Sequence, residues 1–303
     1  MNHFEKTKHY VHSGNICLAA YHWGRLDADR ETIVLVHGYP DAADVWQLVA
    51  ERLAADFNVV AYDVRGTGLS DIPETTQGYA FDYLVQDLSQ VIQAISPNQA
   101  IHLVGHDWGA LQAWEAVLGD RLKPQIASYT ALAPSADHVG WWFQRQLAQR
   151  NFQGYFNVAK RITASGYMAM FQMPILPELT WHLGLDKLWS TLVGYLENTT
   201  VEASPTQLRN AKSGLGLYRQ NLVKPLLNPS RRRTTIPVQM LLMNQDPFVP
   251  LSLSQCMQEW VQDIRYTEVS AGHWGILSQP QPIAEKIQKF VQSMSENRPK
   301  QIV

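Results

Sequence analysis

The sequence predicts an α/β fold, in which a mostly parallel sheet is covered by helices on both faces. Short, β-branched apolar runs alternate with helical stretches in both halves of the chain, and this alternation is typical of a parallel sheet. The apolar run at residues 101–104 leads through a glycine-flanked turn straight into a helix. Residues 135–233 lack any strand pattern flanked by helices, so we expect an all-helical insertion there.

The predicted elements follow one another in regular order outside that insertion. Apolar runs of strand length, bounded by turn residues such as those at 13–15, define the strands, and helical periodicity defines the helices. Before the insertion, strands are expected at residues 10–12, 16–21, 32–36, 58–62, 101–104 and 126–132, with helices at 45–55, 81–95 and 110–118. After it we expect a strand at 237–243, a helix at 253–261, a strand at 266–269 and a closing helix at 283–294.

The insertion divides the chain into two parts. We expect residues 1–134 and 234–303 to form the α/β core, and residues 135–233 to form a helical cap, or lid. In open parallel sheets, ligands bind beyond the carboxyl ends of the strands, so a cap is well placed to cover a binding site. Most aromatic residues of the cap must form its own core, and only a few can face a cavity. The predicted substrate-pocket residues are Trp141, Met170, Phe171, Phe248 and Trp274.

The composition is that of an ordinary soluble globular protein. Of 303 residues, 46% are apolar and 17% are charged, and the formal net charge of −2 gives no electrostatic reason to expect nucleic acid or an anionic membrane as partner. The N-terminus lacks an apolar signal region and no apolar run reaches the length of a membrane span, so a cytoplasmic location is expected. Cys17 and Cys256 indicate neither a disulfide framework nor a zinc site. The basic cluster at residues 231–233 is interpreted as a solvated loop.

The turn after the strand at 101–104 carries the clearest chemical signal. Residues 105–109 are Gly-His-Asp-Trp-Gly, the strand–turn–helix pattern that holds a nucleophile on a sharp bend, with glycines where a Cβ would collide. Because the central residue is Asp107, its carboxylate is expected to attack a carbon that bears a leaving group and to form an ester. The alternative is that the glycines merely shape a turn and Asp107 caps the next helix.

An aspartyl ester needs a base that delivers water, and His273 is the predicted base. It follows the last predicted strand in the sequence Ala-Gly-His-Trp, which fits the chain order nucleophile, acid, histidine of this architecture. The histidine in turn needs a carboxylate to fix its tautomer and stabilise the imidazolium. Asp246, after the strand at 237–243, is favoured for this role, and Asp137, after the preceding strand, stays open as an alternative.

The sequence His-Gly-Tyr-Pro at residues 37–40 is expected to complete the site. The backbone N–H groups of Tyr39 and Trp108 are expected to converge on the oxyanion formed when water attacks the ester. Losing one such donor typically costs about 3–4 kcal/mol of transition-state stabilisation. His37 is expected to orient the loop rather than to react. The sequence leaves open whether the Tyr39–Pro40 bond is cis.

With these motifs, the chain resembles an α/β-hydrolase of the epoxide hydrolase group over essentially its whole length. The shared motifs are His-Gly-Tyr-Pro, Asp-Val-Arg-Gly, Gly-Thr-Gly-Leu-Ser, Gly-His-Asp-Trp-Gly-Ala, Gln-Asp-Pro and Gly-His-Trp. More narrowly, Val-Ala-Tyr-Asp-Val-Arg-Gly, Asp-His-Val-Gly and Gly-Leu-Gly-Leu-Tyr-Arg are similar to the hydrolase domain that some bacteria fuse to a short-chain dehydrogenase. No second nucleotide-binding pattern follows in this sequence, so a dehydrogenase domain is not expected within it.

The resemblance implies an eight-stranded sheet and the hydrolysis of an epoxide to a vicinal diol, with no metal and no organic cofactor. The implied partners are a small hydrophobic substrate and water, and the implied state is a monomer or homodimer. The family also uses two cap tyrosines to hold and protonate the epoxide oxygen, as a phenol of pKa near 10 can at neutral pH. Tyr218 matches one of these positions. At the other, just before Phe-Gln-x-Pro, this chain has Met170, and the nearest tyrosine is Tyr167, about one helical turn earlier.

Two other functions stay open. A haloalkane dehalogenase resembles this chain in fold, in the aspartate nucleophile and in the tryptophan that follows it. Its halide is bound by N–H donors, commonly including an asparagine after His-Gly, where this chain has Tyr39, and that difference together with Tyr218 favours the epoxide. Tryptophans in the cap could supply such N–H donors, so a haloalkane substrate stays an alternative. The other alternative is a protein that keeps the fold and only binds a ligand, against which stand an apparent nucleophile, base, acid and oxyanion loop in one chain.

Overall fold

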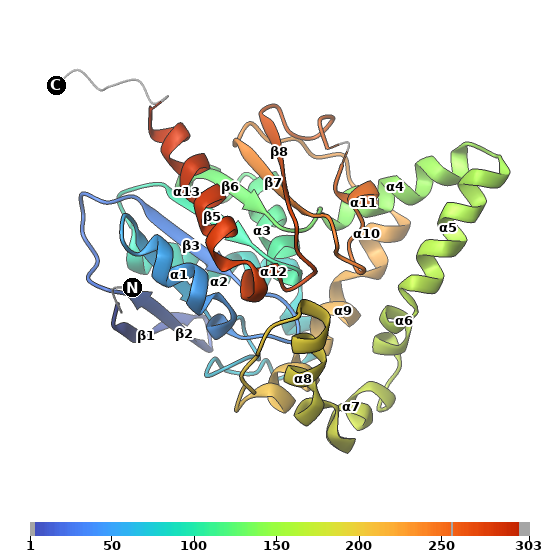
Figure 1. Ribbon diagram of the computed structural model, residues 1–303, viewed down its shortest axis with the longest axis horizontal. Coiled ribbons are helices and arrows are strands. Elements are labelled where there is room, and N and C mark those ends of the chain that lie inside the picture. The colour runs from blue at the N-terminus through green and yellow to red at the C-terminus, as the bar shows by residue number, and fades with distance from the viewer. Residues whose placement is uncertain (1–3, 256, 297–303) are drawn as a thin grey trace.

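A single eight-stranded sheet lies at the centre of the computed structural model, which describes residues 4–255 and 257–296 (Figure 1). The strand order is β1-β2-β4-β3-β5-β6-β7-β8. β1 pairs antiparallel with β2, and β2 pairs antiparallel with β4, while the other neighbouring pairs are parallel. The predicted mostly parallel eight-stranded sheet is therefore confirmed. The strands are β1 (Lys6–Ser13), β2 (Ile16–Trp23), β3 (Thr32–Val36), β4 (Asn58–Tyr62), β5 (Ile101–Gly105), β6 (Ile126–Ala131), β7 (Val238–Met243) and β8 (Ile264–Val269).

The register of the central strands brings three loops to one edge of the sheet. β3, β4 and β5 are buried along their whole length, as their apolar runs predict for strands covered on both faces. Val36, the last residue of β3, is paired with Tyr62 at the end of β4 and with Gly105 at the end of β5. The residues that follow these strands therefore start from one level, at the carboxyl edge where ligands bind in such sheets.

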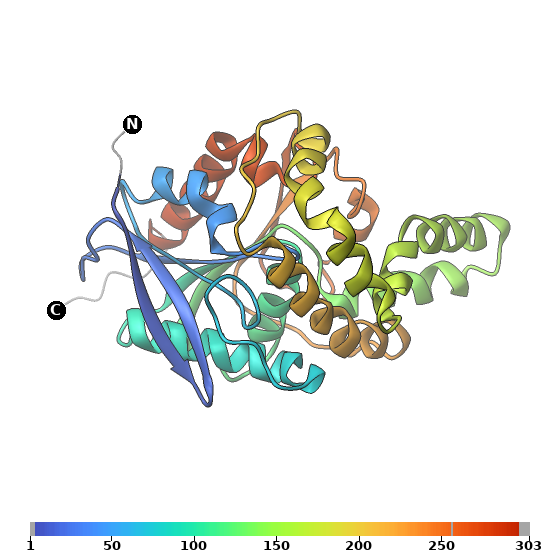
Figure 2. The ribbon, with the colours of Figure 1, turned by 90° about the horizontal axis from the view of Figure 1, so that it is seen from below.

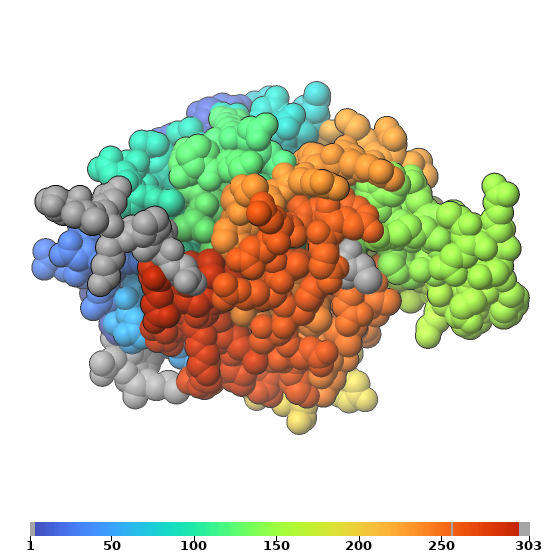
Figure 3. Space-filling model, turned by 90° about the horizontal axis from the view of Figure 1, so that it is seen from above, coloured from blue at the N-terminus to red at the C-terminus, as the bar shows by residue number. Residues whose placement is uncertain are grey.

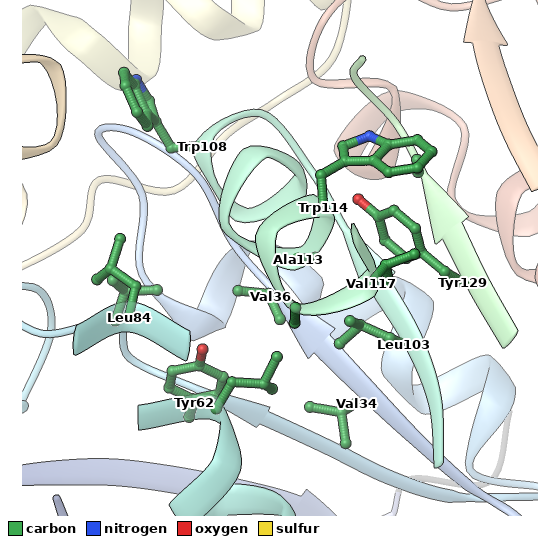
Figure 4. Close-up of a cluster of buried hydrophobic side chains, with 14 of the residues drawn as sticks. Val34, Val36, Tyr62, Leu84, Leu103, Trp108, Ala113, Trp114, Val117 and Tyr129 are labelled. Atoms are coloured by element: carbon green, nitrogen blue, oxygen red, sulfur yellow. The ribbon is translucent and has the colours of Figure 1, made fainter. Parts of the chain in front are cut away.

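Helices cover both faces of the sheet and create a hydrophobic core on each (Figure 2). On one face α1 packs against α13 and buries Leu53 and Ile287. On the other, α2 and α3 bring Leu84 and Trp114 into the cluster that contains Leu103 of β5 (Figure 4). Burying one such side chain fully stabilises the fold by roughly 1.5–3 kcal/mol. The covering elements are η1 (Ala43–Trp46), α1 (Gln47–Leu53), η2 (Thr76–Tyr79), α2 (Phe81–Ile95), α3 (Trp108–Leu118), η3 (Lys123–Gln125), α12 (Gly275–Ser278) and α13 (Pro280–Glu296).

Between β6 and β7 the chain forms only helices and their connections, as predicted for residues 135–233, all of which are described. α4 and α5 form a hairpin that projects from the rest of the molecule (Figures 1 and 3). α9 packs against η2 of the core and against α6. None of the helices in the described ranges is long and apolar enough to cross a membrane. The inserted helices are α4 (Ala136–Ala148), α5 (Phe152–Ala164), α6 (Gly166–Gln172), α7 (Leu176–Thr180), the π-helical turn η4 (Trp181–Leu185), α8 (Asp186–Glu197), α9 (Gln207–Asn221) and α10 (Val223–Leu227).

The helix predicted at residues 253–261 is wrong. Apolar residues recur there at the spacing of an amphipathic helix and are buried, so the pattern imitates one. The helix found in this region, α11 (Leu251–Ser254), ends early, and the described chain then turns. Val261 forms an isolated parallel bridge with Thr234, so its backbone is held by a neighbouring segment instead of by a helix. Cys256 lies outside the described residues.

The turn between β5 and α3 bends the backbone sharply at Asp107. This residue has φ +50° and ψ −124°, a conformation that L residues rarely adopt, and its side chain makes no capping hydrogen bond to α3. A Cβ at Gly105 would lie 2.7 Å from the Cα of Ala110, and a Cβ at Gly109 would collide with the carbonyl oxygen of Val36. The glycines therefore let the turn pack against β3, and the alternative of Asp107 as a helix-capping side chain is wrong.

Replacing Gly109 by alanine is expected to destabilise the fold by about 2 kcal/mol or more, because the added methyl meets backbone rather than a movable side chain. Gly166→Ala, at the start of α6, is the matched control, since a Cβ there meets nothing within 4 Å. Urea unfolding followed by circular dichroism compares the two variants with the parent. Equal unfolding midpoints for Gly109→Ala and Gly166→Ala would contradict the packing of this turn.

Candidate active site

Three side chains that the sequence predicts to act together meet at the carboxyl edge of the sheet. Asp107 follows β5, Asp246 follows β7 and His273 follows β8. His273 donates through Nδ1 to Asp246 Oδ2 at 2.7 Å, and its Nε2 lies 3.5 Å from Asp107 Oδ2. The imidazole therefore lies between two carboxylates that come from different loops.

The loop after β7 fixes the orientation of Asp246. Its Oδ1 accepts hydrogen bonds from the backbone N–H groups of Phe248 at 2.7 Å and Val249 at 2.9 Å. This arrangement leaves Oδ2 free for His273, so the carboxylate can fix the tautomer of the ring in the way expected of a triad acid.

Asp137, the carboxylate that the sequence left open as an alternative, is paired elsewhere. Its Oδ2 lies 2.6 Å from Nη2 of Arg232, and Arg232 also donates to both carboxylate oxygens of Glu115 at 2.6 and 2.8 Å. Arg231 lies over the ring of Trp141, 4.4 Å from a ring centroid. The segment is a loop in which Arg231 and Arg233 are exposed, as predicted, but the interpretation as a solvated loop is wrong for Arg232, which fastens the end of the insertion to α3 and α4.

The loop after β3 contributes a backbone donor to Asp107. The N–H of Tyr39 donates to Asp107 Oδ1 at 2.8 Å, and the Tyr39–Pro40 peptide bond is cis. Trp108 begins α3, so its N–H is one of the donors that a helix leaves unpaired at its N-terminus. The N–H of Tyr39 therefore contacts the carboxyl group of Asp107, and the role of the Trp108 N–H as the second oxyanion donor stays a prediction.

Two buried histidines hold the loops around this carboxylate. His37 accepts through Nε2 from the N–H of Val64 at 3.0 Å and donates through Nδ1 to the carbonyl of Gly38 at 2.8 Å. His106 donates through Nε2 to the carbonyl oxygen of His273 at 2.8 Å, and burial and the charge of His273 lower the pKa of His106 to about 4. Both act on backbone groups, as expected of orienting residues. In the described part of the chain, no cluster of His, Cys, Asp or Glu is arranged to hold a metal ion.

The electrostatics of the site favour a charged Asp107. Burial alone would raise the pKa of its carboxyl, but the hydrogen bond and charge of His273 and the N–H of Tyr39 outweigh burial, so the pKa lies below its usual value. Burial would likewise lower the pKa of His273, but Asp246 and Asp107 raise it to about 10. At neutral pH the resting site therefore holds a carboxylate beside an imidazolium.

A cavity of about 350 Å³ opens at Asp107, between the core and the inserted helices. Tyr218 of α9 and Tyr167 of α6 both line it. Burial and the charge of Asp107 raise the pKa of both phenols, so both are O–H donors at neutral pH. The rest of the wall is largely apolar and includes Leu111, Phe143, Ile162, Met168, Leu222 and Leu253.

Of the five residues predicted to line the substrate pocket, Phe248 borders this cavity and the other four do not. Phe171 is buried behind the wall, with its ring edge-on to that of Tyr218. Trp274 is also buried, and its Nε1 donates to Asp41 at 3.1 Å. Phe171 and Trp274 therefore pack against residues of the site without lining the cavity.

Trp141 and Met170 are the other two predicted pocket residues that lie elsewhere. Trp141 turns away from the cavity, and its Nε1 donates to the carbonyl of Ser230 at 3.2 Å. Met170 packs against the larger hydrophobic core. The sequence marks both helices as apolar, but it does not tell which apolar side chains face the cavity when the same helix also packs against a neighbour.

Sequence reasoning missed two charged residues that the structure brings to this region. Glu197, at the end of α8, accepts from the N–H of Trp274 at 2.8 Å and from Ser278 Oγ at 2.7 Å, so the insertion grips the loop that carries His273. Arg161 of α5 lines the cavity. Neither residue stands in a recognisable motif, and only the burial of their charged groups distinguishes them.

Comparison with known sequences places this architecture among characterised proteins. The profile of the α/β-hydrolase fold family matches residues 31–280. The chain is 30% identical over 294 residues to the probable oxidoreductase EphD of Mycobacterium tuberculosis (strain ATCC 25618 / H37Rv), a match that covers 93% of this chain and 49% of EphD. It therefore spans about half the length of that relative. It is 25% identical over 300 residues to epoxide hydrolase 3 of Xenopus tropicalis, covering 93% of this chain and 74% of that one.

Solved structures show the same architecture. A variant of an epoxide hydrolase from Bacillus megaterium, complexed with its naphthyloxy-propanediol product, matches with a TM-score of 0.74 and 25% identity, covering 94% of this chain and 100% of that one. Epoxide Hydrolase A from Mycobacterium thermoresistibile matches with a TM-score of 0.72 and 21% identity over 95% of this chain and 98% of that one, a likeness of fold alone.

Replacing Asp107 by asparagine is expected to lower the pKa of His273 by about one to three pH units, because it removes one of the two carboxylates that stabilise the imidazolium. NMR titration of the histidine side chains measures this pKa. Asp137→Asn is the control, since Asp137 pairs with Arg232 and not with His273. A His273 pKa that falls in Asp137→Asn and stays constant in Asp107→Asn would contradict the geometry.

Proposed function

The chain belongs to the α/β-hydrolase fold family, and from that premise we propose that it is an epoxide hydrolase, which opens a hydrophobic epoxide to a vicinal diol through an ester on Asp107. One observation carries the proposal: an ionised carboxylate and two protonated tyrosines, Tyr218 and Tyr167, line one apolar cavity, with His273 directly beside the carboxylate. A nucleophile opposite acid donors is what opening an epoxide ring requires. The relatives described above that are named epoxide hydrolases support the same activity.

In the first proposed step, Asp107 Oδ2 attacks one ring carbon of the epoxide. Oδ1 is held by the N–H of Tyr39, so Oδ2 is the oxygen free to form the new bond. As the C–O bond to Asp107 forms, the ring C–O bond breaks and its electrons go to the epoxide oxygen. Tyr218, assisted by Tyr167, donates the proton that this oxygen takes up. The products of the step are a neutral hydroxyalkyl ester of Asp107 and a tyrosinate. The tyrosinate regains its proton from the imidazolium of His273 through solvent, which leaves the ring neutral.

In the second proposed step, His273 activates water against that ester. Esterification removes the negative charge of Asp107, one of the two charges that raise the pKa of His273. The pKa of the ring therefore falls, and more of the ring is in the neutral form that can accept a proton. The imidazole takes a proton from water, whose oxygen attacks the ester carbonyl. The N–H groups of Tyr39 and Trp108 stabilise the resulting oxyanion, and Asp246 stabilises the imidazolium. Collapse breaks the ester C–O bond, and the leaving alkoxide takes the proton held by His273, which releases the diol. The carboxylic acid of Asp107 then gives its remaining proton to the ring, which restores the carboxylate and the imidazolium.

We further propose that residues 135–233 act as a cap over a core made of residues 1–134 and 234–303. The proposal is supported by the origin of the cavity walls, because the core supplies Asp107 and Phe248 while the insertion supplies Tyr167 and Tyr218. The likeness to hydrolase domains that bacteria fuse to a short-chain dehydrogenase is supported by EphD, which is named a probable oxidoreductase and is matched over 49% of its length. A cytoplasmic location and a monomeric or homodimeric state stay predictions.

His273→Gln is expected to accumulate the ester, since it removes the base of the second step and leaves the nucleophile in place. Intact-mass analysis after soaking with styrene oxide should show addition of the whole epoxide, whereas bromobutane would add its alkyl group with loss of hydrogen bromide if the chain were a haloalkane dehalogenase. The double variant Asp107→Asn/His273→Gln is the control. An adduct that persists in the double variant would remove Asp107 from the nucleophile role.

Tyr218→Phe is expected to slow single-turnover alkylation of Asp107 by about 100-fold, because general acid assistance typically contributes that much or more. Tyr167→Phe is expected to slow it less if Tyr218 is the principal donor. Tyr155→Phe serves as the control, since Tyr155 lies on α5 with 52% of its surface exposed. Rapid-quench measurement of the ester gives the rate, and an unchanged rate in both Tyr218→Phe and Tyr167→Phe would remove the acid role from these tyrosines.

A further inference from the structure

The wall of the cavity contains a buried guanidinium that the proposed reaction does not use. Arg161 lies in the last turn of α5, and only 7% of its surface is exposed. It lines the same cavity as Asp107. Taking a charged group out of water costs several kcal/mol, and arginine is seldom buried without an opposite charge. The burial of Arg161 in an otherwise largely apolar wall therefore calls for a partner.

Among the residues that the structure describes, the hydrogen-bond partner of Arg161 is neutral. Nε and Nη2 of Arg161 both donate to the hydroxyl oxygen of Ser165, at 2.9 and 2.7 Å. No carboxylate among the described residues forms an ion pair with Arg161. Burial lowers the pKa of the guanidinium, while the more distant Tyr167 and Asp246 act to raise it, and an arginine remains charged at neutral pH. Arg161 thus lines the cavity without an ion-pair partner among the described residues.

The other charged group of the cavity does not balance it. Among the described residues that line the cavity, Asp107 carries a negative charge at neutral pH and Arg161 carries a positive one. Asp107 already faces the imidazolium of His273 and accepts from the N–H of Tyr39. Asp107 and Asp246, the two carboxylates around His273, leave one negative charge at that end of the site, whereas Arg161 has no carboxylate among the described residues within ion-pair distance, so a ligand carboxylate would pair with it directly.

The chemistry of that ligand follows from the walls. Besides Arg161 and Asp107, the cavity is lined largely by apolar side chains such as Met168 and Leu222, which suit a hydrocarbon chain. A planar guanidinium matches a carboxylate, which it binds through parallel N–H···O bonds. A dianionic phosphate would bring twice the negative charge of a carboxylate into the same apolar space, so a carboxylate is the better fit.

We propose that Arg161 binds the carboxylate of the substrate, so that the epoxide opened at Asp107 is carried on an apolar chain that ends in a carboxylate. This inference rests on the proposed function and adds the class of substrate to it. The epoxide lies at Asp107 and the tyrosines, while the carboxylate lies at Arg161 and Ser165. Arg161 is thus a specificity-determining residue and takes no part in the bond-making steps.

The test compares ω-epoxyalkanoates of increasing chain length with their methyl esters. The parent protein should prefer the acid over the ester in kcat/KM by about tenfold to a hundredfold at the best chain length, as expected for a charge-assisted hydrogen-bonded pair. In Arg161→Gln this ratio should fall to about one. Lys160→Gln removes the neighbouring charge, which is exposed, and should keep the ratio of the parent protein.

A ratio near one in the parent protein, or an undiminished ratio in Arg161→Gln, would overturn the proposal. If Arg161→Gln does not fold, the parent protein alone decides, because decanoate should inhibit hydrolysis of styrene oxide far more strongly than decanol, and equal inhibition would overturn the role of Arg161. If neither acid nor ester nor styrene oxide is hydrolysed, the proposed function fails. Calorimetric binding of decanoate but not decanol would then still support the carboxylate site, and its absence would overturn it.

Discussion

The position of His273 between two carboxylates is the interaction on which the rest of the site depends. Three strand ends bring Asp107, Asp246 and the imidazole together, and the register of the sheet keeps their loops at one edge. The two anions raise the pKa of the ring, and the ring lowers the pKa of Asp107. Esterification removes the charge of Asp107 and so lowers the pKa of His273, which makes the neutral, basic form of the ring more populated.

The inserted helices complete a site that the sheet edge begins. They contribute Tyr218, Tyr167 and Arg161 to the cavity that Asp107 lines, so much of the wall comes from a different part of the chain than the carboxylate. Glu197 links the two parts, because it binds the backbone of the loop that carries His273. Packing within the insertion can therefore affect the position of the imidazole as well as the shape of the cavity.

The sequence predicted the sheet and the three interacting side chains because each follows from local chemistry. Glycines that no side chain can replace mark the turn at Asp107, and strand ends mark the loops of Asp246 and His273. The cavity wall could not be predicted in this way. Apolar residues of the insertion face a cavity, a core or solvent according to tertiary packing, which is why Phe143 lines the cavity and Trp141 of the same helix does not. Arg161 carries no local signal, since its isolation is a property of the folded wall.

The most direct test of the account is a single turnover in water labelled with heavy oxygen, with the protein in excess over a simple epoxide. If Asp107 supplies the oxygen that bonds to carbon, the diol of this first turnover is unlabelled. The label then appears in the peptide that contains Asp107, because water attacks the ester carbonyl. A labelled diol together with an unlabelled peptide would mean that water attacks the epoxide directly, and would contradict the covalent role of Asp107.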